Sequence, residues 1–172
     1  MSLTEGFVDR LAGAEIGQTF NQYRASGLLR ERLEAYLEAR RDAPLLLAGE
    51  AAGYRGARIS GIPFTSERQL TGRGPAEATA TIVHRVLDEL ALEGSVLLWN
   101  VVPTHPGTAS TNRRPTCAEI DAALPFLRQL ARRRRAVPVG RVAHAVLGGT
   151  YIRHPSHGGA QAFRAGLIES LK

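Results

Sequence analysis

Three polar residues that could do chemistry each follow an apolar run of the sequence. Glu50 follows the run at 45–48, Asn100 follows the run at 96–99, and His154 follows the short run at 150–152. A carboxylate can hold a water molecule, an amide can both donate to and accept from a planar heterocycle, and an imidazole can donate to a developing oxyanion. Ligands of open parallel sheets bind beyond the carboxyl ends of the strands, so neighbouring strands would bring these three groups together.

The apolar pattern predicts an alternation of strands and helices. Continuous apolar stretches predict buried strands, and a period of three to four residues predicts helices between them. The predicted strands are 44–49, 95–102, 136–140 and 150–155, and the predicted helices are 26–43 with Ser26 as cap, 75–93 opened by Pro75, 116–131 with a Thr116–Glu119 capping box, 141–148 and 159–171. We therefore expect one domain over residues 1–172, a three-layer α/β/α sandwich around a central four-stranded, mainly parallel sheet.

The composition narrows the class of protein. The net charge is +6, and 21 of the 22 basic residues are arginine, which suits contacts with phosphate groups. Cys117 is the only cysteine, which excludes an internal disulfide or a multi-cysteine metal site. Because no apolar run is long enough to cross a bilayer and no signal peptide is evident at the N-terminus, we expect a cytoplasmic protein without a membrane partner.

Familiar catalytic templates fit the sequence poorly. It has no phosphate-binding G-x-x-x-x-G-K-[ST] loop, no dinucleotide-binding G-x-G-x-x-G and no G-x-S-x-G elbow. Ser156 lies between His154 and His157 without that elbow, so a hydrolase triad has little support. The two histidines have no carboxylate close to them in sequence, and we expect no metal site.

Four segments in this order resemble the uracil-DNA glycosylase superfamily. They are GEAAG (49–53) with GIPF (61–64), WNVVP (99–103), NRRPTCAEI (112–120) and RHPSHGG (153–159). The middle segments are most similar to the bacterial and archaeal branch that carries an iron–sulfur cluster. The cysteine ligands of that cluster are missing here, so the resemblance implies a relative without cluster or other cofactor.

The resemblance implies excision of uracil from single- or double-stranded DNA by a monomer, through hydrolysis of the N-glycosidic bond. The base must leave the stack and enter a pocket, where Phe64 would stack on it and Asn100 would bind its O4/N3 edge. His154 would stabilise negative charge on O2. The pocket would also include Gly49, Ala51, Gly53 and Tyr54, and the segment Arg153, Ser156, His157, Gly158 and Gly159 would contact DNA.

Two departures from the family pattern leave alternatives open. Many members hold the attacking water with Asp or Asn at the third position of the first motif, which is Ala51 here. Glu50 is the first candidate for that role, and Asn112 and His105 are the others. Gly53 replaces a tyrosine that excludes thymine in one branch, which predicts tolerance of other deaminated or 5-substituted bases, with Tyr54 closing part of the gap.

The remaining alternatives concern the wedge and the class of protein. His157 stands where an intercalating residue is usual, and it would either wedge into the DNA or lie at the surface. A non-catalytic module that binds uracil or abasic DNA, and an unrelated nucleotide-processing α/β enzyme, are the two competing hypotheses.

Overall fold

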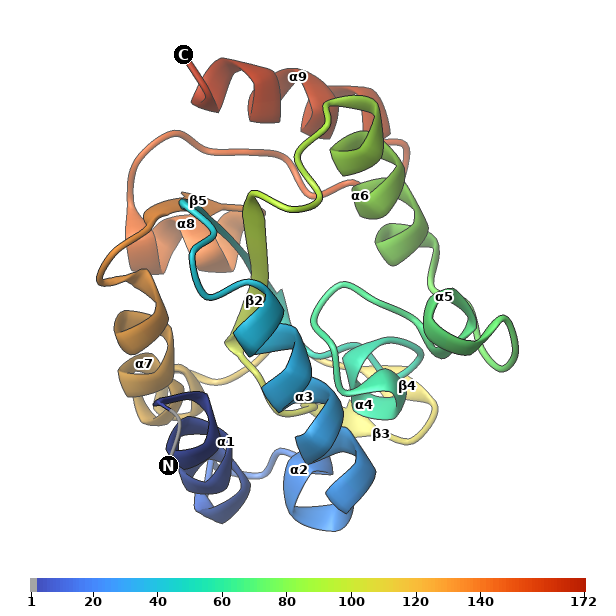
Figure 1. The fold of residues 1–172 in the computed structure, drawn as a ribbon, viewed down its shortest axis with the longest axis vertical. Helices are drawn as coiled ribbons and strands as arrows, with labels where there is room; N and C mark the ends of the chain where they lie inside the picture. The colour runs from blue at the N-terminus through green and yellow to red at the C-terminus, as the bar shows by residue number, and fades with distance from the viewer. Residues whose placement is uncertain (1–2) are drawn as a thin grey trace.

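The computed structural model describes residues 3–172, in which helices surround a small parallel sheet (Figure 1). The strands are β1 Leu45–Ala51, β2 Val96–Val102 and β5 Arg135–Pro138, with a two-stranded hairpin of β3 Gly107–Thr108 and β4 Thr111–Asn112. The helices are α1 Leu3–Gly13, α2 Gln22–Ala25, α3 Gly27–Ala39, α4 Ala57–Ser60, α5 Glu67–Thr71, α6 Ala78–Glu89, α7 Cys117–Ala131, α8 Arg141–Leu147 and α9 Ala160–Ser170.

β1 is the central strand of the sheet, whose order is β2-β1-β5 with all neighbours parallel. Its first residue, Leu45, pairs with Val96 of β2 and with Arg135 of β5. This register places the carboxyl ends of β1 and β2 side by side, with Gly49 opposite Asn100.

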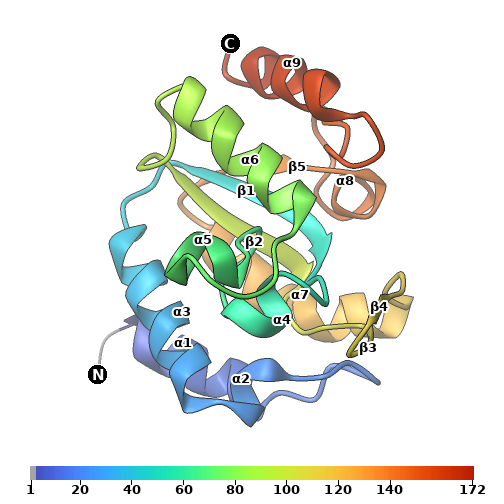
Figure 2. The same cartoon turned by 90° about the vertical axis from the view of Figure 1, so that its right-hand side faces the viewer.

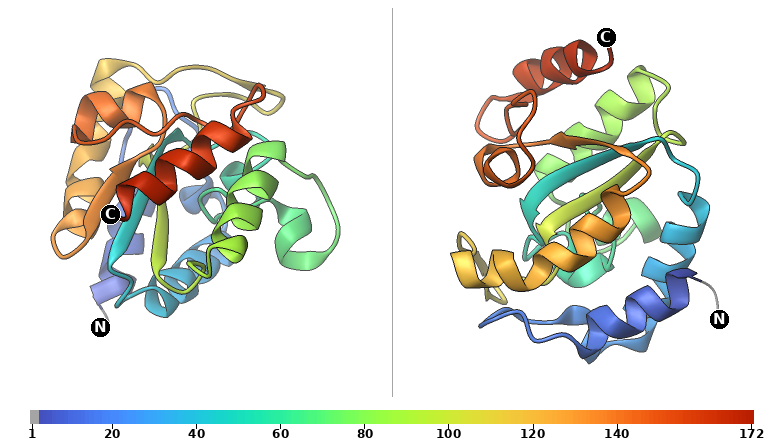
Figure 3. Two further views of the ribbon diagram at one scale, coloured as in Figure 1. Left: turned by 90° about the horizontal axis from the view of Figure 1, so that it is seen from above. Right: turned by 90° about the vertical axis from the view of Figure 1, so that its left-hand side faces the viewer.

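The predicted sandwich of two helical layers around a parallel sheet is confirmed, as Figures 2 and 3 show. Side chains alternate between the faces of a strand. In β1 and β2, Leu46 and Trp99 pack with α1, α3, α7 and α8, whereas Leu47 and Leu98 pack with α6 and α9. The same alternation gives Gly49 and Asn100 the α6 face.

The predicted fourth strand is wrong in extent. Residues 150–155 contribute only an isolated parallel bridge between Ile152 and Val139, which extends the β5 edge by one residue. Gly148 and Gly149 adopt positive φ just before it, and Pro155 has no N–H to donate just after it. The segment therefore touches the sheet and turns away, so the main sheet has three strands among the described residues.

Most predicted helices are present, with one shifted start. Ser26 caps α3 by accepting from the Leu29 N–H, and the Thr116–Glu119 capping box begins α7. The helix predicted to open at Pro75 begins instead at Ala78, because the Pro75 carbonyl accepts the Arg68 N–H and belongs to the turn after α5.

Glu119 fastens the loop before α7. Its side chain is almost fully buried and accepts two hydrogen bonds from the Arg113 guanidinium, at 2.6 and 2.8 Å. It also accepts from the backbone N–H groups of Gln18 and Thr116. The Arg113 guanidinium and these N–H groups lower the pKa of Glu119 to about 2.

Candidate active site

Gly49, Phe64 and Asn100 form the inner part of the site. A Cβ added to Gly49 would overlap the Phe64 ring and lie 3.1 Å from the Asn100 side-chain oxygen. Glycine at this position therefore lets the ring lie against the end of β1, next to the amide. Phe64 is 8% exposed and Asn100 is 4% exposed.

The side-chain amide of Asn100 has no hydrogen-bond partner among residues 3–172, although it is buried and lines a cavity. Amides in the interior are nearly always hydrogen-bonded to protein or to water, and the Asn100 amide is accessible only through this cavity. An unpaired amide beside an aromatic ring is the arrangement expected of a site that completes its hydrogen bonds with a ligand.

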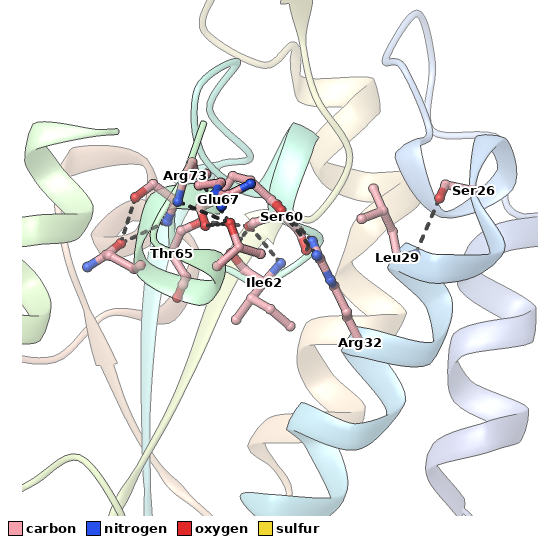
Figure 4. Close-up of polar contacts among 11 residues, drawn as sticks. Ser26, Leu29, Arg32, Ser60, Ile62, Thr65, Glu67 and Arg73 are labelled. Carbon is pink, nitrogen blue, oxygen red and sulfur yellow. Dashed lines mark hydrogen bonds and ion pairs between the residues drawn. The ribbon is translucent and has the colours of Figure 1, made fainter. Parts of the chain in front are cut away.

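The loop that carries Phe64 is held by a network of polar contacts, part of which Figure 4 shows. Ser60 Oγ donates to the Thr65 carbonyl at 2.6 Å and accepts from the Ile62 N–H at 3.0 Å. Tyr23 adds a hydrogen bond from its hydroxyl to the Gly61 carbonyl. These contacts stabilise Phe64 at a φ of 52°, which non-glycine residues rarely adopt.

An ion pair ties the same loop to α3. The Arg32 guanidinium donates to both Glu67 carboxylate oxygens, at 2.8 and 3.1 Å, and to the Ser60 carbonyl at 3.2 Å (Figure 4). Both side chains are mostly buried. Arg32 thus holds both ends of the loop, through Ser60 at its start and Glu67 at its end. The position of Phe64 therefore depends on α3 as well as on the sheet.

His154 presents one ring nitrogen to the site. The Ser156 N–H donates to His154 Nδ1 at 3.2 Å, and the Ser156 hydroxyl lies 2.8 Å from the same atom. Nδ1 is thus the acceptor, and the proton of the neutral ring is on Nε2, which has no partner among the described residues. Burial, with a smaller contribution from His157, lowers the pKa of His154, which favours this neutral form.

Two connected cavities meet at these residues. An inner recess of about 50 Å³ is lined by Phe64, Asn100 and Ala57. An outer groove of about 580 Å³ is lined by four arginines, Arg113, Arg114, Arg141 and Arg153. Six residues line both: Glu50, Ala51, Gly53, Glu77, Thr79 and His154. A ligand that enters the recess from the groove must pass these six residues.

Glu77, the N-cap residue of α6, was not predicted as a site residue. A Cβ on Gly53 would lie 2.9 Å from a Glu77 carboxylate oxygen, and a Cβ on Gly56 would overlap it. The glycines of this loop thus make room for a carboxylate from another element. An acidic residue at a helix start is ordinary in a sequence, so only the spacing of the glycines hinted at a neighbour.

Glu50, a predicted site residue, lies at the boundary of the two cavities, and its surroundings are partly apolar and partly charged. Strand alternation assigns it to the face opposite Gly49 and Asn100. Burial raises the pKa of Glu50, and the charge of Arg114 opposes that rise. The carboxylate therefore has a cation for a neighbour in the groove.

The two other predicted water-holding candidates are engaged elsewhere. Asn112 lines the groove, and its side-chain oxygen accepts the Tyr54 N–H at 2.9 Å. His105 is fully buried and lines neither cavity; its Nδ1 and Nε2 each lie 2.7 Å from a carbonyl oxygen, those of Ala52 and Thr108. His105 joins the first motif to the β3–β4 hairpin, and Tyr54 is tied to that hairpin outside both cavities.

The predicted DNA-contacting segment forms the rim of the groove. Arg153, Ser156 and His157 line it, and Gly158 is exposed beside them with a φ of 75°. Gly159 is buried and lies against the His154 carbonyl oxygen, which a Cβ at this position would overlap. His157 has a φ of 51°, and both His157 and Gly158 are exposed to solvent.

The groove is positively charged. Arg113, Arg114, Arg141 and Arg153 all line it, whereas Glu50 and Glu77 are its only acidic residues among those described. Arg113 is already paired with Glu119, which leaves the other three for an anionic ligand such as a phosphodiester backbone.

The family of the chain follows from comparisons with known proteins. A model of the Uracil DNA glycosylase superfamily matches residues 37–169, which include every predicted site residue. The chain belongs to the uracil-DNA glycosylase superfamily. Among solved structures, the glycosylase-like fold is similar to the crystal structure of wild-type SMUG2 from Pedobacter heparinus, with a TM-score of 0.68 over 99% of this chain and 97% of that one, at 14% identity. No curated protein sequence gives a match.

The site of this superfamily member does not fit an iron–sulfur cluster. The single cysteine, Cys117, is exposed, and cluster binding needs several thiolates. In the described part of the chain no three His, Cys, Asp or Glu side chains are grouped to hold a metal ion, and no helix is long and apolar enough to span a bilayer.

Proposed function

We propose that this superfamily member is a monofunctional DNA glycosylase that flips uracil out of DNA and hydrolyses its N-glycosidic bond, leaving an abasic site. The observation that carries the proposal is the unpaired Asn100 amide, which lies beside the Phe64 ring and shares a recess with His154. These three groups offer a stacking face, a donor–acceptor pair and a single N–H donor, which match the face and polar edge of uracil.

The chemistry follows from the positions of the groups. The base enters the recess, where Phe64 stacks on it and the Asn100 amide pairs with its O4/N3 edge. As the bond from C1′ to N1 breaks, the electron pair moves onto the base and negative charge grows on O2. The His154 Nε2–H is preorganised to donate to that oxygen, and removing one such donor typically costs 10²–10³ in rate.

The rim would bind the DNA backbone. The Ser156 hydroxyl and the exposed Gly158 backbone would contact phosphate, and Gly159 keeps the chain close to the rim although its own N–H is donated to the Ser156 carbonyl. Arg114, Arg141 and Arg153 supply positive charge along the groove. This binding would weaken with salt, because each phosphate contact releases counterions. Gly53 leaves room beside the base, so we extend the proposal to other deaminated or 5-substituted bases.

The test is base release from oligonucleotides that contain one uracil, in single- and double-stranded form, followed by alkaline cleavage of abasic sites. Strand breaks at the uracil position are the expected result, and their absence at stoichiometric protein would contradict the proposal. Asn100→Ala should abolish most cleavage and also inhibition by free uracil, because both need the amide.

A second candidate is a module that binds uracil or abasic DNA without chemistry. It is favoured by Ala51, an apolar residue at the position where many members hold the attacking water. It predicts tight binding of abasic or uracil-containing DNA with no strand breaks after alkali.

A further inference from the structure

The carboxylate of Glu77 has no structural role that the contacts of the described chain reveal. As the N-cap residue of α6 it makes no side-chain cap hydrogen bond. Its carboxylate forms no ion pair or hydrogen bond with any group of residues 3–172, although its backbone carbonyl accepts from the N–H and the hydroxyl of Thr81. Burial alone raises its pKa. A partly buried carboxylate without a partner costs stability, so its position in the cavity wall points to a use outside folding.

Two glycines hold this carboxylate close to the backbone of the first motif. Any side chain at Gly56 would overlap it, and one at Gly53 would press on it at 2.9 Å. The segment between them is therefore shaped around Glu77 from α6. It is the second acid of the site besides Glu50, and it comes from a different element.

Glu77 also lies at the boundary between the recess and the groove, where the glycosidic bond of a bound nucleotide would be. The base occupies the recess and the sugar and phosphates occupy the groove, so the glycosidic bond between them crosses the boundary. Glu50, Glu77 and His154 are the titratable residues that line both cavities. His154 serves the base, and Arg114 offsets the charge of Glu50. Glu77 is left as the carboxylate with no cation beside it.

We propose that Glu77 holds the attacking water and takes its proton. This inference rests on the proposed glycosylase function. Glu77 would take over the role of the water-holding residue that Ala51 replaces in the first motif. The water oxygen forms a bond to C1′ while the C1′–N1 bond breaks with its electron pair on the base. One water proton passes to the Glu77 carboxylate and is then released to the departing base anion, which restores the carboxylate. A raised pKa suits a carboxylate that takes up a proton at neutral pH.

The test compares Glu77→Ala and Glu77→Gln with Glu89→Gln, an exposed acid on the same helix. Single-turnover base release is measured on uracil DNA, and affinity is measured on the same oligonucleotide with a 2′-fluoro substituent that slows cleavage. We expect both Glu77 variants to lose about 10²–10⁴ in rate and to keep their affinity, with Glu89→Gln unchanged.

Formate supplies a readout that a structural role would not produce. Glu77→Ala leaves space beside Gly53 and Gly56, where the carboxylate lay. Formate in that space should restore part of the lost rate of Glu77→Ala, because it supplies a carboxylate as proton acceptor, without effect on the wild-type protein. An unchanged rate in Glu77→Ala would overturn the inference, as would a rate loss matched by lost affinity and insensitive to formate. Absence of base release by the wild-type protein would instead overturn the proposed function.

Discussion

The backbone N–H of Ser156 donates to Nδ1 of His154, only two residues earlier in the chain. This contact decides which ring nitrogen carries the proton. Because Nδ1 accepts, the neutral imidazole must present its N–H from Nε2, and that atom is unpaired where the recess and groove meet. The HPS motif therefore contains its own device for orienting a hydrogen-bond donor.

His154→Ala should lower the single-turnover rate of uracil release by about 10²–10³, because the donor to the base oxygen is lost. Affinity for uncleavable uracil DNA should change little. Ser156→Ala should lose less, because the backbone N–H that sets the tautomer remains. Equal losses in the two variants would show that the serine hydroxyl is needed as much as the ring, which would contradict the role given to the backbone N–H.

The ring of His154 should titrate below the ordinary histidine value of about 6.5, because burial disfavours its charged form. A group whose pKa is lowered on folding adds stability above its unfolded pKa, and that contribution is lost as the pH falls below it. NMR titration of the ring should give a midpoint below that of a peptide histidine. A midpoint above 6.5 would contradict the neutral form.

Gly49→Ala should remove most base release and lower the free energy of unfolding by about 1–3 kcal/mol, since its Cβ would overlap the Phe64 ring. Gly94→Ala is the matched control, because a Cβ at Gly94 meets nothing within 4 Å. Activity and denaturant midpoints of the two variants are compared. A fully active Gly49→Ala would show that the stacking position of Phe64 is dispensable.

Glu119→Gln should lower the free energy of unfolding by about 1–3 kcal/mol at pH 7, because the hydrogen bonds from Arg113 and from two backbone N–H groups then go to a neutral side chain, while Arg113 itself keeps access to water. The pKa of Glu119 falls from its ordinary value to about 2 on folding. Its contribution is therefore complete above the unfolded value and is lost as the pH falls toward 2. Urea unfolding at pH 7 and pH 3 should show the difference between the proteins shrinking.

Glu77→Gln should unfold at the same temperature as the wild-type protein or at a higher one. Burial raises the pKa of Glu77, so its charge destabilises the folded state once the pH exceeds the unfolded value, and the amide carries no such charge. Calorimetry at pH 7 and pH 4 checks this, with the gain confined to pH 7. A large loss of stability would indicate a structural partner for the carboxylate.

Much of the fold could be predicted because its signals are local. Continuous apolar runs identified β1 and β2, and the Thr116–Glu119 box fixed the start of α7. Four helices were not predicted. Helices α2, α4 and α5 have only four or five residues, too few to show a helical period, whereas α1 was overlooked although its buried Phe7, Val8 and Leu11 have helical spacing. The fourth strand was overestimated because the apolar residues at 150–152 could not reveal that the chain makes one bridge and leaves.

The site residues, too, were predicted where the signal was local and missed where it depended on contacts between distant segments. Phe64, Asn100 and His154 stand in motifs whose order marks them, and the structure brings them to one recess. Glu77 has no motif, because its place depends on how α6 lies over a loop more than twenty residues earlier. Conversely, His105 lies in the predicted segment, yet its ring is directed to two carbonyls. Packing between distant elements, invisible in one sequence, decided both.

The central position of β1 has a consequence for the order in which the molecule forms. Leu45 must find Val96 on one side and Arg135 on the other, so the second edge closes a loop of about ninety residues, a slow step for a small domain. During synthesis from the N-terminus, β1 and β2 emerge before β5 and before the segment that carries His154. The recess that Phe64, Asn100 and His154 line therefore acquires its last member only when the C-terminal part of the chain has joined the sheet edge.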